Sequence, residues 1–166
     1  MVNQKNMLIT AMITAGAVIA FFLFFQNDEA KIKKKFQVLA KRIDKQADES
    51  DLMAAAAANQ IKKMFGKSIR IEIPSYSVDK TFPRNEISPH VLYVRSQYIE
   101  MKITFHDFQF HFPKEDIAVV GLTAVFKATT ATGERVDEIH EMECALEKVD
   151  DKWFFTGIRG IEVLER

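Results

Sequence analysis

The sequence has little cysteine and no excess of charge of either sign. Its 166 residues contain one cysteine, Cys144, so no disulfide can form within the chain and the redox compartment stays open. Lysine plus arginine total 23, as do aspartate plus glutamate, and this balance argues against a nucleic-acid-binding domain. The six glycines form no phosphate-binding loop, and no G-x-S-x-G nucleophile motif occurs. The spacing of His106 and His111 matches no metal signature, so neither a metal nor a cofactor is predicted.

Apolar residues, in contrast, are abundant and include a long run near the start. Residues 7–25 read MLITAMITAGAVIAFFLFF, with no charged residue and no proline. In a helix, this run spans roughly 28 Å, about the thickness of a bilayer hydrocarbon core. It therefore predicts a single-pass transmembrane anchor at Met7–Phe25, which binds the lipid bilayer. A tail at residues 1–6 precedes the anchor, and one soluble domain at residues 26–166 follows it.

Cleavage and orientation of this segment stay open. A signal peptide is the alternative, with Val18 to Ala20 as a weak cleavage site, but an apolar stretch would directly follow that cut. The lysines of residues 31–35 favour a cytoplasmic domain by the positive-inside rule. N-terminal signal-anchors, however, usually leave a short basic tail inside and export the rest. The two arguments conflict, and export of the domain is the preferred orientation.

Helical spacing of apolar residues dominates the first half of the soluble part. Ser50 or Asp51 can cap the second helix, and Gly66 is a plausible end for it. Asn85 can cap the third helix, with Pro89 in its first turn, where backbone N–H groups have no helical partner. Helices are accordingly predicted at residues 28–45, 52–65 and 85–98.

Alternation with a period of two marks the strands. A short strand at residues 69–73 is followed by a loop that contains Phe82. In the next strand the apolar parity switches at His106 and Asp107, which predicts a β-bulge that keeps both halves inward. The long strands are predicted at residues 101–113, 117–129, 135–149 and 152–164. Helices followed by an antiparallel meander indicate an α+β fold, with helices packed on a strongly bent antiparallel sheet.

This order resembles the nuclear transport factor 2-like superfamily, whose fold is a cone-shaped, cystatin-like α+β domain. The resemblance covers roughly residues 28–166. It is carried by the helix pair, the third helix and the C-terminal run ERVDEIHEMECALEKVDDKWFFTGIRGIEVLER. The superfamily includes isomerases, dehydratases, transport adaptors and scaffold modules, so the resemblance implies a fold and leaves the function open. Membrane-anchored members occur in bacterial inner-membrane assemblies, which implies that location here.

Polar residues on the strands are the candidates for chemistry. Glu138 and His140 share parity with apolar residues of their strand, and Arg159 shares parity with those of the last strand. A carboxylate in an apolar cavity can act as a general base, as in ketosteroid isomerase, an enzyme that resembles the same fold. The alternative is that these groups are solvated or paired across strands. Cys144 lies among apolar neighbours and is predicted to be an inert core thiol. The candidates are Asp107, His111, Glu138, His140 and Arg159.

Two functions remain in competition. In the preferred hypothesis the domain is a non-catalytic interaction or scaffold module, with a second copy or a membrane protein as partner. In the alternative, a pocket inside the cone binds a small molecule or acts as an isomerase- or dehydratase-type enzyme. The two differ in whether the cone is hollow. It is not hollow if five phenylalanines fill it: Phe105, Phe108, Phe110, Phe126 and Phe155.

Overall fold

The computed structural model of this chain describes residues 27–74 and 77–161. The predicted tail and anchor, residues 1–6 and 7–25, lie outside the described residues, as does the end of the predicted last strand. Within the described ranges, no helix is both long enough and apolar enough to cross a membrane.

A helix over residues 27–43 confirms the first prediction to within two residues. The chain comprises two compact units, one ending at Lys34 and the other beginning at Lys35. In the described part of the first unit, Lys31 pairs with Asp28 one helical turn earlier, at 3.8 Å. The second unit holds the end of this helix and all the remaining elements.

Helix α2 (Asp51–Lys62) begins where it was predicted and ends earlier. The Ser50 hydroxyl accepts a hydrogen bond from the Met53 N–H at 3.3 Å, which is an N-cap. The prediction that Gly66 ends this helix is wrong, because Gly66 lies within a strand. A Cβ at Gly66 would come within 3.0 Å of a Thr156 methyl carbon, so glycine here allows two strands to approach closely.

Helix α3 (Arg84–Ser96) differs from its prediction at its start. The N-cap position is Pro83, which has no side-chain cap, so the predicted capping role of Asn85 is wrong. Pro89 lies inside the helix and not in its first turn. A proline there removes one helical hydrogen bond, and the packing of α3 against α2 and the sheet has to offset that loss.

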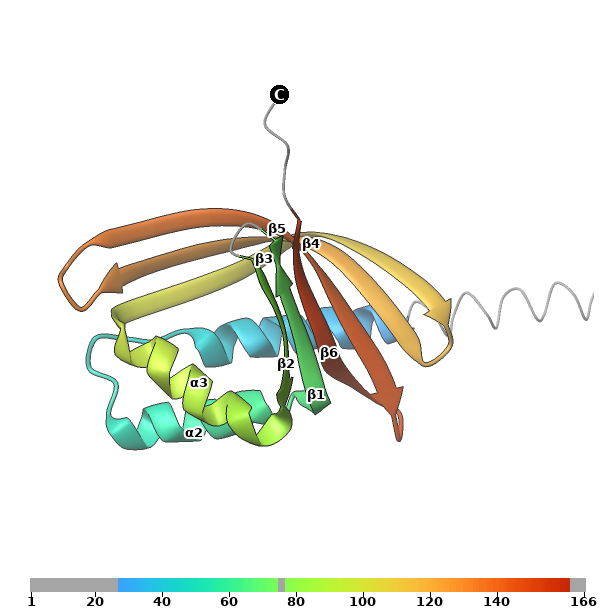
Figure 1. Cartoon of the computed structure of the whole chain (residues 1–166), viewed down its shortest axis with the longest axis horizontal. Helices are drawn as coiled ribbons and strands as arrows, with labels where there is room; N and C mark the ends of the chain where they lie inside the picture. Colours follow the sequence, from blue (N-terminus) through green and yellow to red (C-terminus); the bar gives the residue numbers. More distant parts are fainter. Residues whose placement is uncertain (1–26, 75–76, 162–166) are drawn as a thin grey trace, which may run out of the picture. The chain divides into compact units, whose positions relative to one another are not determined.

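A six-stranded sheet forms the rest of the unit, in the order β2-β1-β6-β5-β4-β3 (Figure 1). The predicted all-antiparallel meander is correct for the last four strands, whereas β1 and β6 pair in parallel. β2 was predicted as a loop, and its pairing with β1 extends the sheet by one edge strand. The strands are β1 (Phe65–Ile73), β2 (Val78–Pro83), β3 (Tyr98–Lys114), β4 (Ile117–Thr130), β5 (Arg135–Val149) and β6 (Lys152–Ile161).

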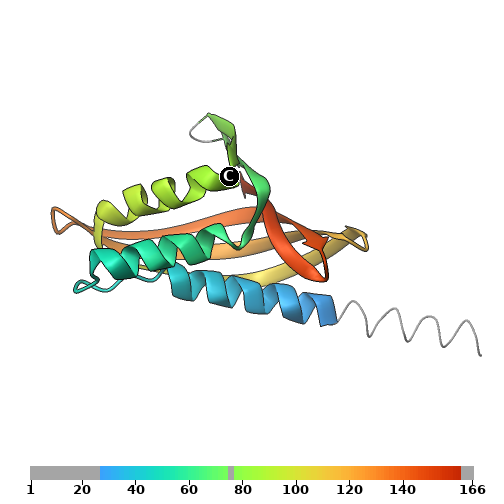
Figure 2. The same cartoon turned by 90° about the horizontal axis from the view of Figure 1, so that it is seen from below.

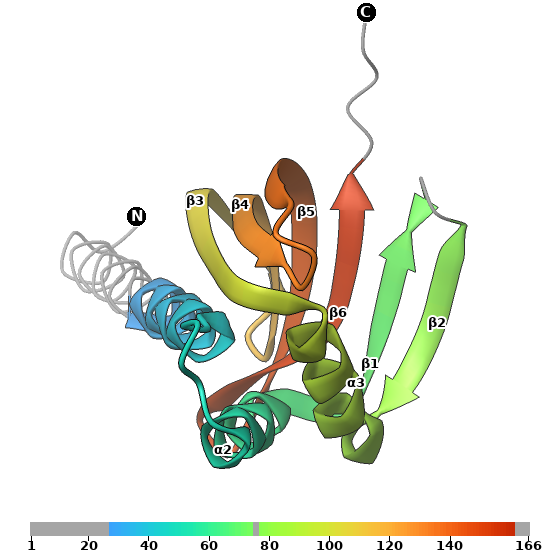
Figure 3. The same cartoon turned by 90° about the vertical axis from the view of Figure 1, so that its left-hand side faces the viewer.

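The predicted bulge in the first long strand is confirmed. The pairing of β3 with β4 shifts register between His106 and Gln109, and Asp107 has a φ of 55°. The extra residue keeps Phe105 and Phe108 on the same side of the sheet, where both rings contact Phe36. A bulge increases local twist and bends its strand, and β3 curves strongly in Figure 3.

The helices cover the concave face of this bent sheet. Figure 2 shows α2 and α3 side by side across that face, and the Ser88 hydroxyl of α3 donates to the Ala58 carbonyl of α2 at 3.4 Å. Phe36 is at the centre of the core, where its ring meets those of Phe105, Phe108 and Phe155 edge-on at 5.0–5.3 Å. Such edge-to-face packing is favourable for aromatic rings and anchors the helix of residues 27–43, from Lys35 onward, to the sheet.

Candidate functional site

A cavity of about 350 Å³ lies between the concave face of the sheet and the helices. Almost every atom that lines it is apolar, and its walls come from all three helices in the described part of the chain and from each of its strands except β4. Phe105 and Phe155 form part of the wall, whereas Phe108, Phe110 and Phe126 lie elsewhere. The phenylalanines therefore do not fill the interior, and the cone is hollow.

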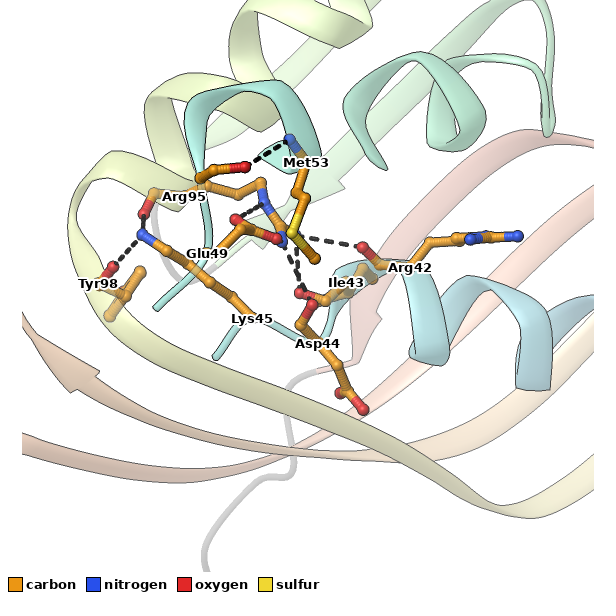
Figure 4. Close-up of polar contacts among 9 residues, drawn as sticks. Arg42, Ile43, Asp44, Lys45, Glu49, Met53, Arg95 and Tyr98 are labelled. Carbon is orange, nitrogen blue, oxygen red and sulfur yellow. Dashed lines mark hydrogen bonds and ion pairs between the residues drawn. The ribbon is translucent and has the colours of Figure 1, made fainter. Parts of the chain in front are cut away.

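Apart from Cys144, two residues of this lining have polar side chains, Arg95 on α3 and His90. The charge of Arg95 is fully paired. The residue is 2% exposed. Its guanidinium donates to both carboxylate oxygens of Glu49, the Nε–Oε2 bond being 3.1 Å (Figure 4). It also donates to the carbonyls of Arg42, Ile43 and Asp44 at 2.9–3.2 Å. These carbonyls end the helix of residues 27–43, so Arg95 acts as its C-terminal cap.

Lys45 forms the reciprocal cap on α3. Its ammonium donates to the carbonyls of Arg95 and Tyr98 at 2.8 and 2.7 Å, at the end of α3 (Figure 4). The backbone of Lys45 also exchanges two hydrogen bonds with Met101 of β3. Two cations thus connect the ends of the two helices, and one of them, Arg95, is also part of the cavity wall. These residues hold the cavity wall and leave no free charge inside it.

Cys144 on β5 lines the cavity among apolar side chains. It is 2% exposed, and burial raises the pKa of its thiol to about 12, with a smaller contribution from the adjacent Glu143 carboxylate. The thiol is therefore protonated at neutral pH and a poor nucleophile. The structure agrees with the prediction that Cys144 is an inert core residue.

The rim of the cavity holds the second polar residue of the lining, His90, next to two side chains of β2. Its exposed imidazole packs edge-on against the ring of Phe82, with centroids 4.9 Å apart. The Lys80 ammonium lies 5.4 Å from the same ring. Lys80 and Phe82 share one face of β2, opposite Ile71 and Ile69 of β1, whose side chains line the cavity. Val78 and Phe82 share the inward parity of this strand, but Lys80 between them interrupts the apolar alternation that would have revealed it.

None of the five candidate residues predicted from the sequence lines this cavity. Glu138 and His140 do lie side by side, with His140 Nε2 and Glu138 Oε2 2.9 Å apart, but both side chains are about half exposed. They share a face of β5 with Met142 and Cys144, beyond the part of the strand that pairs with the described part of β6. This arrangement matches the solvated alternative for the pair.

The other three candidates are separated by irregularities in the strands. Asp107 is the exposed bulge residue, and His111 is exposed further along β3. Arg159 was expected on the side of Phe155, but the register shift between β5 and β6 moves it to the outer face of the sheet. There it lies 3.5 Å from Glu72. The structure does not bring these three residues together with Glu138 and His140.

No protein-family model and no curated protein matches this sequence. Solved structures do match. A scytalone dehydratase-like protein from Novosphingobium aromaticivorans has a TM-score of 0.64 at 14% identity, covering 84% of this chain and 87% of that one. A hexachlorocyclohexane dehydrochlorinase from Novosphingobium barchaimii has a TM-score of 0.62 at 9% identity, covering 84% and 88%. An aromatic-ring-hydroxylase-like protein from N. aromaticivorans has a TM-score of 0.69 at 10% identity, covering 84% and 91%. These likenesses are to the fold, and they show the cone-shaped α+β fold.

Proposed function

We propose that this domain binds an apolar small molecule in the cavity between the bent sheet and its helices. The observation that carries the proposal is a hollow of about 350 Å³ with an almost wholly apolar wall. Ligand sites are commonly concave, apolar and in the range of about 300–1,000 Å³. An apolar cavity of about 150 Å³ already binds benzene, so a molecule roughly twice that size fits here.

Binding without catalysis accounts best for the groups that are present. Among the described lining residues, Arg95 is held by Glu49 and three carbonyls, and burial keeps the Cys144 thiol protonated. His90 is left as a proton donor or acceptor, but it lies at the exposed rim. General acid–base catalysis requires a group within hydrogen-bond reach of the reacting atoms. Fold neighbours that are named as dehydratase and dehydrochlorinase enzymes support a small-molecule site in this fold, and an enzymatic role is the second candidate.

The interaction-module hypothesis has less support. The outer face of the described sheet carries charged residues among its apolar ones, including Glu143, Arg159 and the Arg70–Asp79 ion pair. Ile139 is the most exposed large apolar side chain of the strands, at 69%. Val149 and Ile161 are also exposed, at 47% and 45%, but Glu141, Glu143 and Glu147 lie between Ile139 and Val149 on β5, so these side chains do not form the large contiguous patch that marks an interface.

Native mass spectrometry of the full chain, released gently from detergent, tests the binding proposal. The expected result is a mass excess of roughly 150 Da, about twice the mass of benzene, which disappears when the protein is unfolded. Protein stripped of ligand should gain thermal stability when apolar molecules of this size are added, because a ligand that binds only the folded state stabilises it. If no mass excess appears and no member of an apolar panel shifts Tm, the cavity is not a binding site.

We further propose that residues 7–25 anchor this domain to a membrane, on the basis of their uncharged apolar sequence. The full chain should stay in the membrane pellet after extraction at alkaline pH, which removes peripheral proteins. A chain that begins at residue 27 should be released to the supernatant. Recovery of the full chain in the supernatant would contradict the anchor, and protease protection of intact cells would give the side that the domain faces.

A further inference from the structure

The rim of the cavity differs from its interior in charge as well as in polarity. Inside, apart from the engaged Arg95, the wall offers neither an ion nor a polar partner to a ligand. At the rim, Lys80 and His90 both contact the ring of Phe82, which forms part of the cavity wall. We call this part of the surface the cationic rim, and it consists of Lys80, Phe82 and His90.

No ion pair involves the two basic residues of this rim within the described residues. Within residues 27–74 and 77–161, Lys80 and His90 have ring contacts with Phe82 and no ion pair. The neighbouring acid Asp79 points to the other face of β2, where it holds Arg70 through two hydrogen bonds of 2.9 and 2.8 Å. Glu86 lies one helical turn before His90 on α3 and is the nearest opposing charge along that helix.

These observations constrain the two ends of a ligand separately. A polar head buried inside the cavity would lose its water without gaining a hydrogen bond, which is unfavourable. The head group therefore has to stay at the rim, where the Lys80 ammonium and an imidazole N–H can both donate to it. A neutral oxygen could accept from these donors, but an anionic head gains more, because hydrogen bonds in which a group is charged are the stronger ones.

We propose that the occupant of the cavity is an amphipathic anion, with its apolar body in the cavity and a carboxylate at the cationic rim. This inference rests on the proposed function, because it requires the cavity to be a binding site. A single unbranched or singly cyclic body suits a volume of about 350 Å³. The rim, and not the interior, then sets the preference among molecules with equal apolar bodies.

The test compares three eight-carbon probes that differ only in their heads: octanoate, octanol and octylamine. Each is titrated by calorimetry into the full chain in detergent, and the heat of titration into protein-free micelles is subtracted. We expect octanoate to bind about threefold to fivefold more tightly than octanol, the size typical of ion pairs at a solvent-exposed site. Octylamine should bind most weakly, because its ammonium is repelled by Lys80.

Rim variants separate this preference from binding itself. The double variant Lys80→Gln with His90→Gln should remove the preference, so that octanoate and octanol bind with about equal affinity. Lys127→Gln is the matched control, because Lys127 is exposed on the outer face and pairs with Asp137 at 3.2 Å. It should change none of the three affinities.

The two possible failures give different results. If octanol and octylamine bind as tightly as octanoate, or if the double rim variant keeps the preference, the cationic rim does not select the head group. In that case the cavity still binds an apolar body, and the proposed function stands. If none of the three probes binds, and apolar molecules without a head group also fail, the proposed function itself is overturned.

Discussion

Replacement of Arg95 by methionine should lower the free energy of unfolding by about 3–5 kcal/mol, the cost typical of breaking a buried ion pair. Methionine keeps an unbranched apolar stem, but it leaves the Glu49 carboxylate buried without a cation. It also leaves the carbonyls of Arg42, Ile43 and Asp44 without their donors. Because a domain of this kind is stabilised by about 5–15 kcal/mol in total, this loss is large. Equilibrium urea unfolding, followed by far-UV circular dichroism, measures it.

Two further variants show whether the loss comes from the ion pair. Arg95→Met combined with Glu49→Met should be more stable than Arg95→Met alone, because no uncompensated charge remains buried. Arg70→Met removes an arginine with an equally well-formed bidentate partner, Asp79, at the exposed face and should leave the urea midpoint almost unchanged. Equal midpoints for Arg95→Met and the parent protein would show that this cluster does not hold the helices.

The Arg95 cluster had no signal in the sequence. Glu49 falls in a polar break between helices, and Arg95 occupies an ordinary position near the end of a helix whose apolar residues define its buried stripe. Their contact joins residues 46 positions apart, and its other acceptors are main-chain carbonyls, which carry no residue identity. Only the packing of two helix ends brings these groups together.

Local patterns, in contrast, predicted the last three hairpin-connected strands closely. β5 was expected at residues 135–149 and spans Arg135–Val149. Asp150 and Asp151, expected as a turn, have φ values of 49° and 60°, which suit a tight two-residue hairpin. The bulge in β3 was also predictable, because a switch of apolar parity can keep one face buried only if one residue is added.

Parity arguments failed where a second irregularity lay between the residues compared. Arg159 and Phe155 have the same parity in the sequence, yet the register shift between β5 and β6 separates them to opposite faces. The edge strand β2 was missed because Lys80 interrupts the apolar residues of its inward face and because the strand is only 6 residues long. That error hid Lys80 and Phe82, so the rim could not be assembled from the sequence.

The amino-acid composition alone could not predict the cavity. Fourteen phenylalanines are compatible with a filled or an empty cone, since the answer depends on which rings face inward and how far the helices are held from the sheet. Phe36 packs against three rings at 5.0–5.3 Å. Phe36 and two of these rings, Phe105 and Phe155, form part of the cavity wall and leave the space beside them open.

Filling the cavity should abolish ligand binding while the protein still folds. In Cys144→Phe the new ring extends from the wall into the cavity of about 350 Å³ and takes space that the ligand needs. We expect the affinity for an apolar probe such as octanol to fall by at least about tenfold, since a lost or displaced apolar body costs more than about 1.4 kcal/mol. The free energy of unfolding should change by less than about 1.5 kcal/mol, because the added volume enters existing space.

The matched control is Cys144→Ala, which removes the thiol and leaves the space open. It should bind octanol as the parent protein does, which would show that the thiol has no part in binding and that volume alone decides. Ile103→Phe, which fills the same cavity from β3, should reproduce the loss caused by Cys144→Phe. If both filled variants fold and still bind octanol with the affinity of the parent protein, the ligand lies somewhere other than between the sheet and its helices.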